Sequence, residues 1–411
     1  MALLYSFGIL VYSVLMRLVA LINPKAKKWV SGRKGVFEKL NLFKQGADNQ
    51  LIAWFHCASL GEFEQGRTLI EAHKNAFPSH QILLTFFSPS GYEIQKNYPH
   101  ADYICYLPID SAKNARQFVN LVNPHLAVFV KYEFWYHYLF FLKENKTKII
   151  SVSAIFRPSQ VFFKWYGGFY RNMLMQFDMI FVQNQASFDL LQSIDIQSIR
   201  LSKDTRFDRV RQLTESPKTF EKVVAFKANS KLLVVGSCWA EDFEVILPVI
   251  NACSQDRNLK FIIAPHEIKD AEIKTWQNAL TVKSQRYSDF QDFDANVLFI
   301  DNIGMLSSLY QYADFAWIGG AYGKGLHNTL EAATYGMPLF FGNKAYAKFQ
   351  EALDLLENGC AFSISNMAHF AEKLNYLLDN QLLVNEISAK AKQYVQQNTG
   401  ATNQIMEYLS K

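Results

Sequence analysis

The sequence of 411 residues lacks the patterns that mark a disulfide-rich, thiolate-metal or nucleic-acid-binding protein. Its five cysteines lie far apart and form no CxxC pair, which fits a reducing compartment better than a disulfide framework. Charged residues make up 19%, and a net charge of +5 is too mild to indicate a nucleic-acid partner. No spacing of His, Asp or Glu suggests a metal site. Hydrophobic residues make up 50%, which excludes a disordered chain, and the length is sufficient for two domains.

The first segment, Met1 to Ile22, contains Arg17 as its single charged side chain. It is about as long as the roughly 20 apolar residues that cross a bilayer. We expect an uncleaved membrane anchor or an interfacial helix; spanning and lying flat both stay open, and a helix buried in its own domain is the alternative. A secretory signal peptide would carry its charges before the apolar core, whereas here they follow it. By the positive-inside rule, the rest of the chain is cytoplasmic because of Lys25, Lys27, Lys28, Arg33 and Lys34.

Short apolar runs alternate with segments of helical periodicity from residue 51 onward, which is typical of a parallel sheet covered on both faces. Polarity rises between Lys203 and Lys231, which we interpret as a link with a short helix. The final stretch, Gln381 to Lys411, has the pattern of an amphipathic helix. The expected strands are 51–57, 81–87, 103–107, 125–130, 148–154 and 179–183, followed by 231–236, 260–265, 296–300, 314–319 and 337–342.

Two such series predict an α/β fold of two Rossmann-like, doubly wound domains facing a cleft, with an N-terminal hydrophobic anchor helix. The expected boundaries are 1–24 for the anchor, 25–205 for the first domain and 206–411 for the second, whose last helix can pack back on the first domain. Ligands of open parallel sheets bind beyond the carboxyl ends of the strands. The informative residues should therefore follow strands.

Carboxylates follow two strands of the first half. Glu62 comes near the start of the helix after the first strand, where it is either a general base for a substrate hydroxyl or a favourable charge at a helix N-terminus. Glu133 follows the fourth strand, and the alternative to a catalytic role is an ion pair with Lys131 or Arg157. Two acids at two strand ends of one sheet make a stronger case than either alone.

A glycine-rich loop, Gly319–Gly325, lets the backbone of the second half approach a ligand closely. Lys324 can pair with a phosphate, and a helix start near Asn328 adds N–H donors. Glu331 would lie one turn into that helix, placed to accept from ribose hydroxyls. Together these residues predict a nucleotide-sugar site.

Three further segments carry polar side chains that we weigh in two ways. Ser237 opens the helix after the first strand of the second half, as part of a phosphate site or as a plain N-cap. His266 ends the second strand there, as a phosphate or base contact or as a structural residue. The run 162–171 interleaves aromatic and basic residues, which is typical of a membrane interface or a lipid-phosphate site, or of a helix packed internally.

Motifs spread over nearly the whole chain resemble those of the 3-deoxy-D-manno-octulosonic acid (Kdo) transferases, which build the inner core of lipopolysaccharide. No single motif would suffice, but the ordered set is specific. The motifs are ASLGEF at 58–63, KYEFW at 131–135, SVSAIFRPS at 151–159, TRFDR at 205–209, GSCWAED at 236–242 and GLHNTLEAATYG at 325–336.

The resemblance implies an inverting glycosyltransferase of the GT-B fold that moves Kdo from CMP-Kdo to a lipid A precursor without a metal or another cofactor. The first domain would take the acceptor and the second the CMP-sugar donor, at the cytoplasmic face of the inner membrane. Glu62 matches the family's base, and Glu133 matches its second acid. The donor-binding residues we expect are Arg206, Ser237, His266, Gly320, Lys324, Gly325, Asn328 and Glu331, and the acceptor or membrane residues are Arg157, Lys164, Trp165 and Arg171.

The sequence departs from the family pattern in three places. The family's Pro-Arg-His reads Pro265-His266, Lys203-Asp204 replace Gly-Asn, and Lys131 stands where an acid is common. Two other functions stay open. A GT-B enzyme with a UDP-sugar donor would share the HNxxE region, and a nucleotide-sugar epimerase of the same fold would share both sheets but has no use for an anchor or an aromatic-basic surface.

Overall fold

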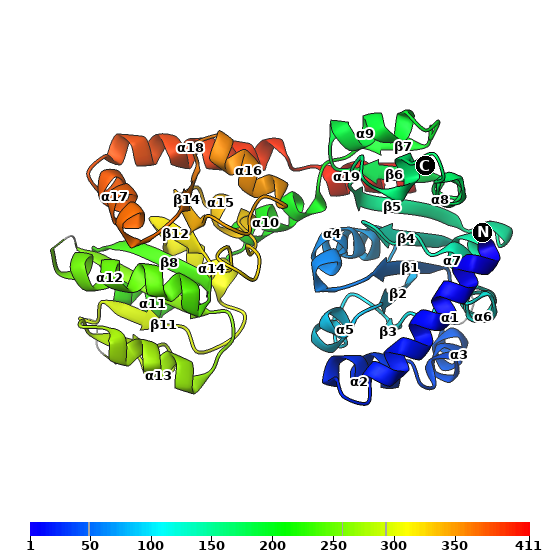
Figure 1. Ribbon diagram of the computed structural model, residues 1–411, viewed down its shortest axis with the longest axis horizontal. Coiled ribbons are helices and arrows are strands. Elements are labelled where there is room, and N and C mark those ends of the chain that lie inside the picture. The colour runs from blue at the N-terminus through cyan, green and yellow to red at the C-terminus, as the bar shows by residue number, and fades with distance from the viewer. Residues whose placement is uncertain (48–49, 257, 292–293) are drawn as a thin grey trace. The chain divides into compact units, whose positions relative to one another are not determined.

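The computed structural model describes residues 1–411 except 48–49, 257 and 292–293, and the chain divides into two compact units. Unit 1 comprises Met1–Arg209 and Thr399–Lys411, and unit 2 comprises Val210–Asn398. Each unit is built on one parallel sheet with helices on both faces (Figure 1). The division falls inside the helix α10 (Thr205–Glu215), close to the expected boundary at 205/206.

Unit 1 contains a seven-stranded sheet in the order β3-β2-β1-β4-β5-β6-β7. Its strands are β1 (Ile52–Cys57), β2 (Gln81–Phe86), β3 (Tyr103–Tyr106), β4 (Leu126–Val130), β5 (Lys148–Ala154), β6 (Met179–Val182) and β7 (Ile199–Leu201). Its helices are α1 (Ala2–Val19), α2 (Pro24–Ser31), α3 (Val36–Gly46), α4 (Leu60–Ala76), α5 (Pro89–Gln95), α6 (Ala112–Val122), α7 (Tyr136–Glu144), the short η1 (Val161–Phe163), α8 (Gly168–Leu174), α9 (Gln185–Gln192) and α19 (Ala401–Leu409).

Unit 2 contains a second seven-stranded sheet in the order β10-β11-β9-β8-β12-β13-β14. Its strands are β8 (Lys231–Cys238), β9 (Leu259–Pro265), β10 (Ser284–Arg286), β11 (Val297–Phe299), β12 (Phe315–Ile318), β13 (Leu339–Gly342) and β14 (Ala361–Ile364). Its helices are α11 (Glu221–Lys227), α12 (Ala240–Asp256), α13 (Asp270–Ala279), α14 (Leu306–Leu309), η2 (Tyr310–Tyr312), α15 (Leu330–Ala333), α16 (Gln350–Glu357), α17 (Met367–Leu378) and α18 (Gln381–Gln397).

Every strand expected from an apolar run is present, because these runs form the interior of the two sheets. In β1 and β4 all side chains are buried, as parallel strands covered on both faces require. The sequence did not indicate the strands β7, β10 and β14, each of which lies at the edge of a sheet. They are short, and β10 reads Ser-Gln-Arg, so no apolar run marks it.

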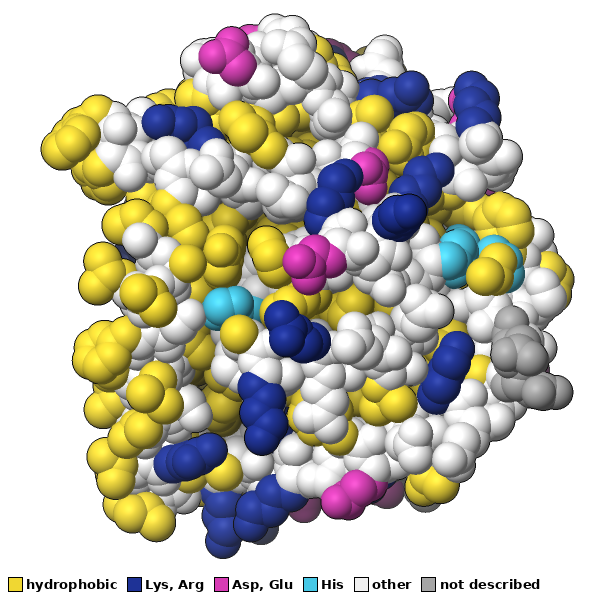
Figure 2. All heavy atoms as spheres, turned by 90° about the vertical axis from the view of Figure 1, so that its right-hand side faces the viewer, with side chains coloured by type: hydrophobic (Ala, Val, Ile, Leu, Met, Phe, Trp, Pro, Cys, Tyr) yellow, Lys and Arg dark blue, Asp and Glu magenta, His cyan; other side chains and the backbone are white. Residues whose placement is uncertain are grey.

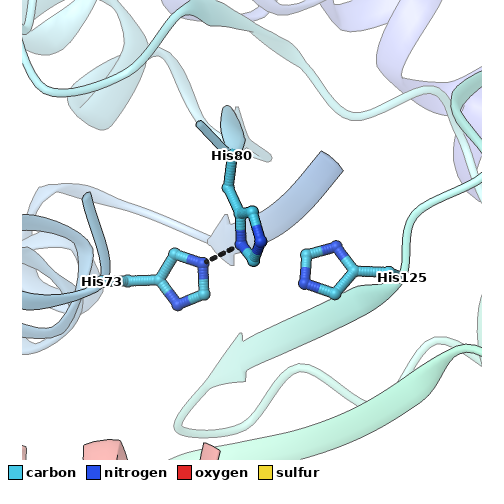
Figure 3. Close-up of side chains that lie close together, drawn as sticks. All are labelled: His73, His80 and His125. Carbon is cyan, nitrogen blue, oxygen red and sulfur yellow. Dashed lines mark hydrogen bonds between the residues drawn. The ribbon is translucent and has the colours of Figure 1, made fainter. Parts of the chain in front are cut away.

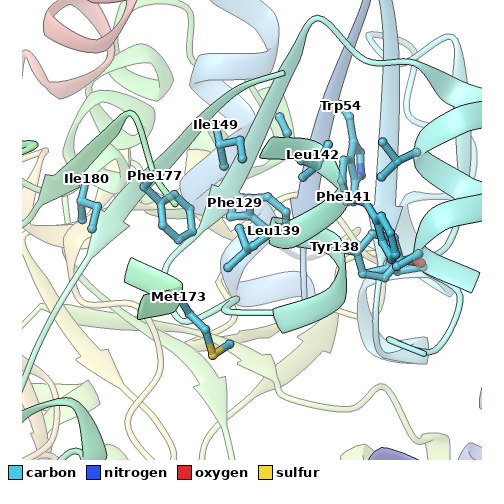
Figure 4. Close-up of a cluster of buried hydrophobic side chains, with 14 of the residues drawn as sticks. Trp54, Phe129, Tyr138, Leu139, Phe141, Leu142, Ile149, Met173, Phe177 and Ile180 are labelled. Carbon is cyan, nitrogen blue, oxygen red and sulfur yellow. The ribbon is translucent and has the colours of Figure 1, made fainter. Parts of the chain in front are cut away.

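Alternate residues of the unit 1 strands pack into two separate cores, one on each face of the sheet. Trp54 and Phe129 belong to one core, which Figure 4 shows against the side chains of α7. Phe55 and Val128, their neighbours along the strands, belong to the other. Because successive side chains point to opposite faces, each strand contributes apolar side chains to both cores, and the helices on both faces pack against the sheet.

Both sheets reverse their winding direction at a central strand pair. In unit 1, β1 lies between β2 and β4, and in unit 2, β8 lies between β9 and β12. Doubly wound sheets bind ligands beyond the carboxyl ends of the strands at such a switch point. The residues that follow β1, β4, β8 and β12 are therefore the first to consider as site residues.

The C-terminal stretch expected as one amphipathic helix is divided in two at Gly400, whose φ of +105° ends one helix and starts the next. α18 belongs to unit 2 and α19 to unit 1. The Asp208 carboxylate accepts from the backbone N–H of Gly400 at 2.5 Å and of Thr402 at 2.6 Å. Ile405 of α19 is fully buried against the sheet of unit 1.

Helix α1 lies on unit 1 along one stripe and leaves its other faces uncovered (Figure 1). Tyr5 donates to Asp110 Oδ2 at 2.6 Å, and Ser6 Oγ lies 2.9 Å from His137 Nε2. Helix α1 is long and apolar enough to cross a membrane. Only 6% of this helix is buried, which excludes a helix buried in its own domain. Its outward side chains include Leu3, Leu4, Phe7, Leu10, Val14, Leu15 and Leu18.

Arg33 differs from the lysines of the basic run because its guanidinium is buried. Its guanidinium donates to the carbonyls of Trp29, Phe87 and Leu107 at 2.8 Å each and lies 3.9 Å from the centroid of the Trp29 ring. Burial lowers the pKa of Arg33 to about 10. This arginine therefore ties α2 to the sheet, while Lys25, Lys27, Lys28 and Lys34 are exposed. Hydrophobic side chains gather along one margin of the face in Figure 2, with Lys and Arg beside them.

Candidate functional site

Glu62 lies in the first turn of α4, just beyond the carboxyl end of β1. Ser59 is the N-cap of this helix: its Oγ accepts from the Gly61 N–H at 3.3 Å, and its hydroxyl donates to Glu62 Oε2. The spacing Ser-x-x-Glu is that of a capping box. Glu62 is half-buried, so its carboxylate is oriented by Ser59 and still reachable by a ligand.

Glu133 lies beyond the carboxyl end of β4 and is 9% exposed. Its Oε2 accepts from the Trp135 indole N–H at 2.7 Å and lies 3.2 Å from His56 Nε2. The alternative of an ion pair with Lys131 or Arg157 is wrong, because the Arg157 guanidinium donates to the Tyr132 hydroxyl at 3.1 Å and Lys131 lies over the Tyr132 ring. Glu133 is thus held by groups from β1 and its own loop.

His56 is a site residue that sequence reasoning missed. It is fully buried in β1, with Nδ1 2.8 Å from Thr85 Oγ1. Trp54 Nε1 also donates to Thr85 Oγ1 at 2.8 Å. His56 thus bridges Thr85 and Glu133, because its two ring nitrogens lie within hydrogen-bond distance of these two side chains. A histidine inside the apolar run IAWFHC was the available signal, since a buried polar side chain needs a partner.

Glu62 and Glu133 both lie close enough to Cys57 to affect its pKa. Burial raises the pKa of the Cys57 thiol, and the charges of Glu62 and Glu133 raise it further. The Tyr132 hydroxyl is affected in the same way, because burial raises its pKa and Glu62 adds to the shift. Cys57 is therefore a buried, neutral thiol that is affected by both carboxylates. Cys57, Cys105, Cys238 and Cys360 are buried free thiols, and the side chain of Cys253 lies outside the described residues.

The backbone adopts positive φ angles at both switch points. Lys131, directly after β4, has φ +69°, and Ser237, near the end of β8, has φ +52°. Such angles are costly for residues other than glycine and concentrate at ligand sites. Lys203 also has φ +69°. Glycine adopts this angle without cost, so the lysine that replaces the family's glycine here strains the backbone.

Asp242 organises the switch point of unit 2 and was not singled out in the sequence. Its carboxylate is fully buried and accepts from the N–H of Trp239 at 3.1 Å, the N–H of Gly320 at 2.8 Å and the Trp317 indole at 3.2 Å. Burial raises the pKa of Asp242, and these donors counteract the rise. The start of α12 is thus held by Asp242 rather than by the Ser237 side chain, and the same carboxylate fixes the glycine-rich loop.

Gly319 and Gly320 of that loop are required by close approaches. A Cβ on Gly319 would lie 2.1 Å from the Ser237 carbonyl oxygen, and one on Gly320 would lie 2.4 Å from the Gly325 carbonyl oxygen. Gly320 and Gly325 also have φ of +92° and +114°. The loop therefore folds tightly against the end of β8, with its backbone at the carboxyl end of β12.

The helix expected near Asn328 is only the short α15, which begins at Leu330. Asn328 Oδ1 accepts from the Leu330 N–H at 3.1 Å, and its amide donates to Glu331 Oε1 at 3.1 Å. Asn328 thus links the loop to the helix start and orients Glu331. A single turn of helix adds few N–H donors, so side chains carry more of this region than we expected.

An aromatic cluster surrounds the loop. The His266 ring stacks on the Trp239 ring with centroids 4.1 Å apart, and the Trp239 indole donates to His327 Nε2 at 3.2 Å. Lys324 lies 5.7 Å from the Trp239 ring centroid. Burial and the neighbouring His266 lower the pKa of His327 to about 4, so that ring is neutral. Trp239 and His327 were not predicted, although GSCWAED and GLHNT contain them.

Arg206 lies in unit 1 rather than in the second domain to which we assigned it. Its guanidinium donates to Asp204 Oδ2 at 2.8 and 3.0 Å, and Gln65 donates to the same oxygen at 3.0 Å. Burial would raise the pKa of Asp204, but the charge of Arg206 and its hydrogen bonds keep the pKa below its usual value. The aspartate that departs from the family pattern is thus the partner of the arginine.

The aromatic-basic run forms a surface segment on unit 1. Trp165 is 92% exposed, whereas the Arg171 guanidinium donates to the carbonyls of Phe162 and Lys164 at 3.0 Å. Arg171 therefore stabilises the turn that presents Trp165. Arg157 is exposed and Lys164 is half-buried.

Known proteins are similar to this chain in both sequence and fold. Residues 34–209 match the model of the family described as 3-deoxy-D-manno-octulosonic-acid transferase (kdotransferase). The Kdo transferase of Rickettsia felis is 26% identical over 88% of this chain and 79% of its own length. The Kdo transferase of Aquifex aeolicus is 26% identical over 82% of this chain and 90% of its own length.

Solved structures share the architecture at low identity. UDP-GlcNAc 2-epimerase from Neisseria meningitidis has a TM-score of 0.63 at 14% identity, covering 87% of this chain and 99% of the epimerase. The UDP-GlcNAc 2-epimerase from Methanocaldococcus jannaschii has a TM-score of 0.57 at 13% identity, covering 88% and 99%. At this identity the likeness shows the fold alone.

The two parallel sheets define a two-unit α/β structure with a GT-B-like fold. The family model over residues 34–209 and the relatives along most of the chain support the Kdo transferase family, which is a family of glycosyltransferases.

Proposed function

We propose that this chain transfers Kdo from CMP-Kdo to a lipid A precursor with inversion at the anomeric carbon. The observation that carries the proposal is the pair of acids at the switch point of unit 1, with Glu62 oriented by Ser59 and Glu133 held by His56 and Trp135. The similarity to Kdo transferases suggests which sugar is transferred, and the site residues suggest which side chains act in the reaction.

Glu62 takes the proton from a glucosamine hydroxyl of the acceptor. The hydroxyl oxygen attacks the anomeric carbon of Kdo, the bond to the phosphate of CMP breaks, and CMP leaves with the electron pair. Glu133 is buried and its Oε2 is held by the Trp135 indole and His56, so we assign it the positioning of its loop rather than the proton transfer. A positioned base contributes about 10²–10⁴-fold to such a reaction.

The donor contacts lie in unit 2, at the glycine-rich loop. Lys324 and the backbone around Ser237 and Gly320 offset the negative charge that grows on the departing phosphate. Asn328 orients Glu331 toward the ribose hydroxyls. In unit 1, Asp204 fixes the direction of the Arg206 guanidinium.

We infer that α1 holds the enzyme at the cytoplasmic face of the inner membrane, where it lies in the interface. The helix packs lengthwise on unit 1 through Tyr5 and Ser6, which supports a helix lying flat rather than spanning. Its uncovered apolar side chains face away from unit 1, and the exposed lysines of α2 supply attraction to anionic lipids. Trp165 and Lys164 add a second contact to the membrane or the lipid acceptor.

The test is mass spectrometry of a tetra-acylated lipid A precursor after incubation with the protein and CMP-Kdo generated in situ. We expect the mass of the acceptor to increase by one or more Kdo residues. Glu62→Gln should lower the rate of product formation by about 10²–10⁴-fold. Glu64→Gln, in the same helix and half-buried, is the matched control and should keep its turnover. Near-normal turnover in Glu62→Gln would refute the assigned base, and binding of UDP in preference to CMP would favour a UDP-sugar donor.

A further inference from the structure

Three histidines from separate segments of unit 1 converge at the end of the sheet opposite the candidate acids (Figure 3). His73 lies near the end of α4, His80 precedes β2, and His125 precedes β4. Glu62 lies at the start of α4, so about eleven residues of helix, or roughly 17 Å, separate it from His73. The cluster is therefore outside the site described above.

Two of the imidazole nitrogens have the spacing that a tetrahedral metal ion requires, and the third lies close to them. Nε2 of His73 lies 3.2 Å from Nδ1 of His80, and one ligand atom from each of the three rings lies within 4.8 Å of the others. A tetrahedral zinc ion with Zn–N distances of about 2.0–2.1 Å places its ligand nitrogens about 3.3 Å apart. His80 and His125 are half-buried, so small rotations of their side chains close the remaining gap.

The hydrogen bonds around the cluster leave lone pairs for a metal ion. His125 Nδ1 lies 2.9 Å from the Ile52 carbonyl oxygen, to which it donates, so Nε2 carries the lone pair. This is the arrangement of a metal-binding histidine, whose other ring nitrogen donates to a carbonyl or carboxylate. His73 is 1% exposed, and its Nδ1 has no hydrogen-bond partner among the described residues, so its ring uses only part of its capacity.

The three rings are available as neutral ligands. Burial, and then the neighbouring imidazoles, lower the pKa of His73 to about 3, and burial lowers the pKa of His80 and His125. Lys74 and Lys148 are positive side chains that act on the rings. The Lys74 ammonium donates to the His80 carbonyl at 3.0 Å and to Asp102 Oδ2 at 2.8 Å, so Asp102 offsets the charge of Lys74.

We propose that His73, His80 and His125 bind a divalent transition-metal ion such as Zn²⁺, with a water molecule as the fourth ligand. The ion would join the end of α4 to the loops that precede β2 and β4. Its role is structural, because its place is at the amino ends of these strands. Nothing in the proposed transfer reaction uses it.

The experiment uses the full chain without a polyhistidine tag, stripped with a chelator, dialysed against Zn²⁺ and measured by inductively coupled plasma mass spectrometry. We expect about one zinc ion per chain. His80→Gln and His125→Gln should lose it, whereas His100→Gln, a histidine elsewhere in unit 1, should keep it. Cobalt in place of zinc should show the intense visible absorption of tetrahedral coordination.

Thermal unfolding gives a second readout that does not depend on activity. Zinc should raise the Tm of the wild-type protein and of His100→Gln by several degrees, because it binds the folded state, and should leave the Tm of His80→Gln and His125→Gln unchanged. If wild-type protein retains no more zinc than His80→Gln, or if all four proteins respond alike, the proposal is refuted. His80 and His125 are chosen because their half-buried side chains can be replaced without opening the core.

Discussion

Asp242 accepts hydrogen bonds from the start of α12, from the glycine-rich loop and from the Trp317 indole. Three donors converge on one carboxylate, so an amide in its place would direct its NH₂ group at another N–H. We predict that Asp242→Asn lowers the free energy of unfolding by about 1–3 kcal/mol and weakens CMP binding at least tenfold. Isothermal titration with CMP and urea unfolding measure the two effects.

Glu241→Gln is the matched control for Asp242, since Glu241 is its exposed neighbour in the same turn. It should leave both CMP binding and stability near the wild-type values. Unchanged CMP binding in Asp242→Asn would contradict the role of Asp242 in shaping the loop.

His327 makes stability depend on pH at the scale of one side chain. Its pKa is lowered from 6.5 to about 4 in the folded protein by burial and by His266. The unfolded state therefore takes up a proton as the pH falls below about 6.5, while the folded state does not until about 4, and stability is lost across that window. At higher pH the contribution is fully present.

Urea unfolding followed by tryptophan fluorescence at several pH values between 7 and 4 measures this loss. His327→Gln keeps an acceptor for the Trp239 indole but removes the titrating group, so its stability should fall less across the window. A variant that loses stability in parallel with the wild type would assign the acid sensitivity to other groups, such as His73.

Helix α1 carries a prediction at the scale of one element. Leu3, Phe7 and Leu10 are 87%, 64% and 60% exposed, so replacing them with Gln removes apolar surface that the fold leaves uncovered. We predict that the triple variant folds but no longer sediments with anionic vesicles. Tyr5→Phe, which loses the hydrogen bonds of this hydroxyl with Asp110 and the Tyr136 N–H, should still sediment. Equal sedimentation of both variants would contradict an interfacial α1.

The elements that could be predicted are those whose sequence has one clear period. The central strands are continuous apolar runs because both of their faces are covered, and Glu62 and Glu133 could be found because they follow such runs. Edge strands such as β10 have no such run. Gly400 was hidden within an amphipathic pattern that continues on both sides of the break between α18 and α19.

The parts of the site that could not be predicted depend on contacts between distant segments. His56 meets Glu133 only because β1 pairs with β4, and Asp242 reaches Gly320 only because β8 pairs with β12. His73, His80 and His125 likewise have no recognisable spacing along the chain. Sheet order, rather than local sequence, brings these side chains together.

At the scale of the whole molecule, the last helix stabilises the first unit. Ile405 of α19 is fully buried in the core of unit 1, and Thr402 Oγ1 lies 2.9 Å from Thr68 Oγ1 of α4. We predict that Ile405→Ala lowers the free energy of unfolding of unit 1 by about 2–5 kcal/mol. Leu382→Ala, at an 86% exposed position of α18, is the control and should change little.

Limited proteolysis distinguishes the two units in this experiment. In Ile405→Ala, cleavage should accelerate at sites in unit 1 and stay at the wild-type rate in unit 2. Faster cleavage confined to unit 2 would contradict the assignment of α19 to unit 1.

Unit 2 is one continuous segment, whereas unit 1 is assembled from both ends of the chain. During translation, residues 210–398 are synthesised before the helix α19 that completes unit 1. The part of unit 1 that is made first therefore keeps some of α4 and its sheet uncovered until α19 has been made. The nascent enzyme is therefore most exposed to proteases and aggregation through the half that was synthesised first.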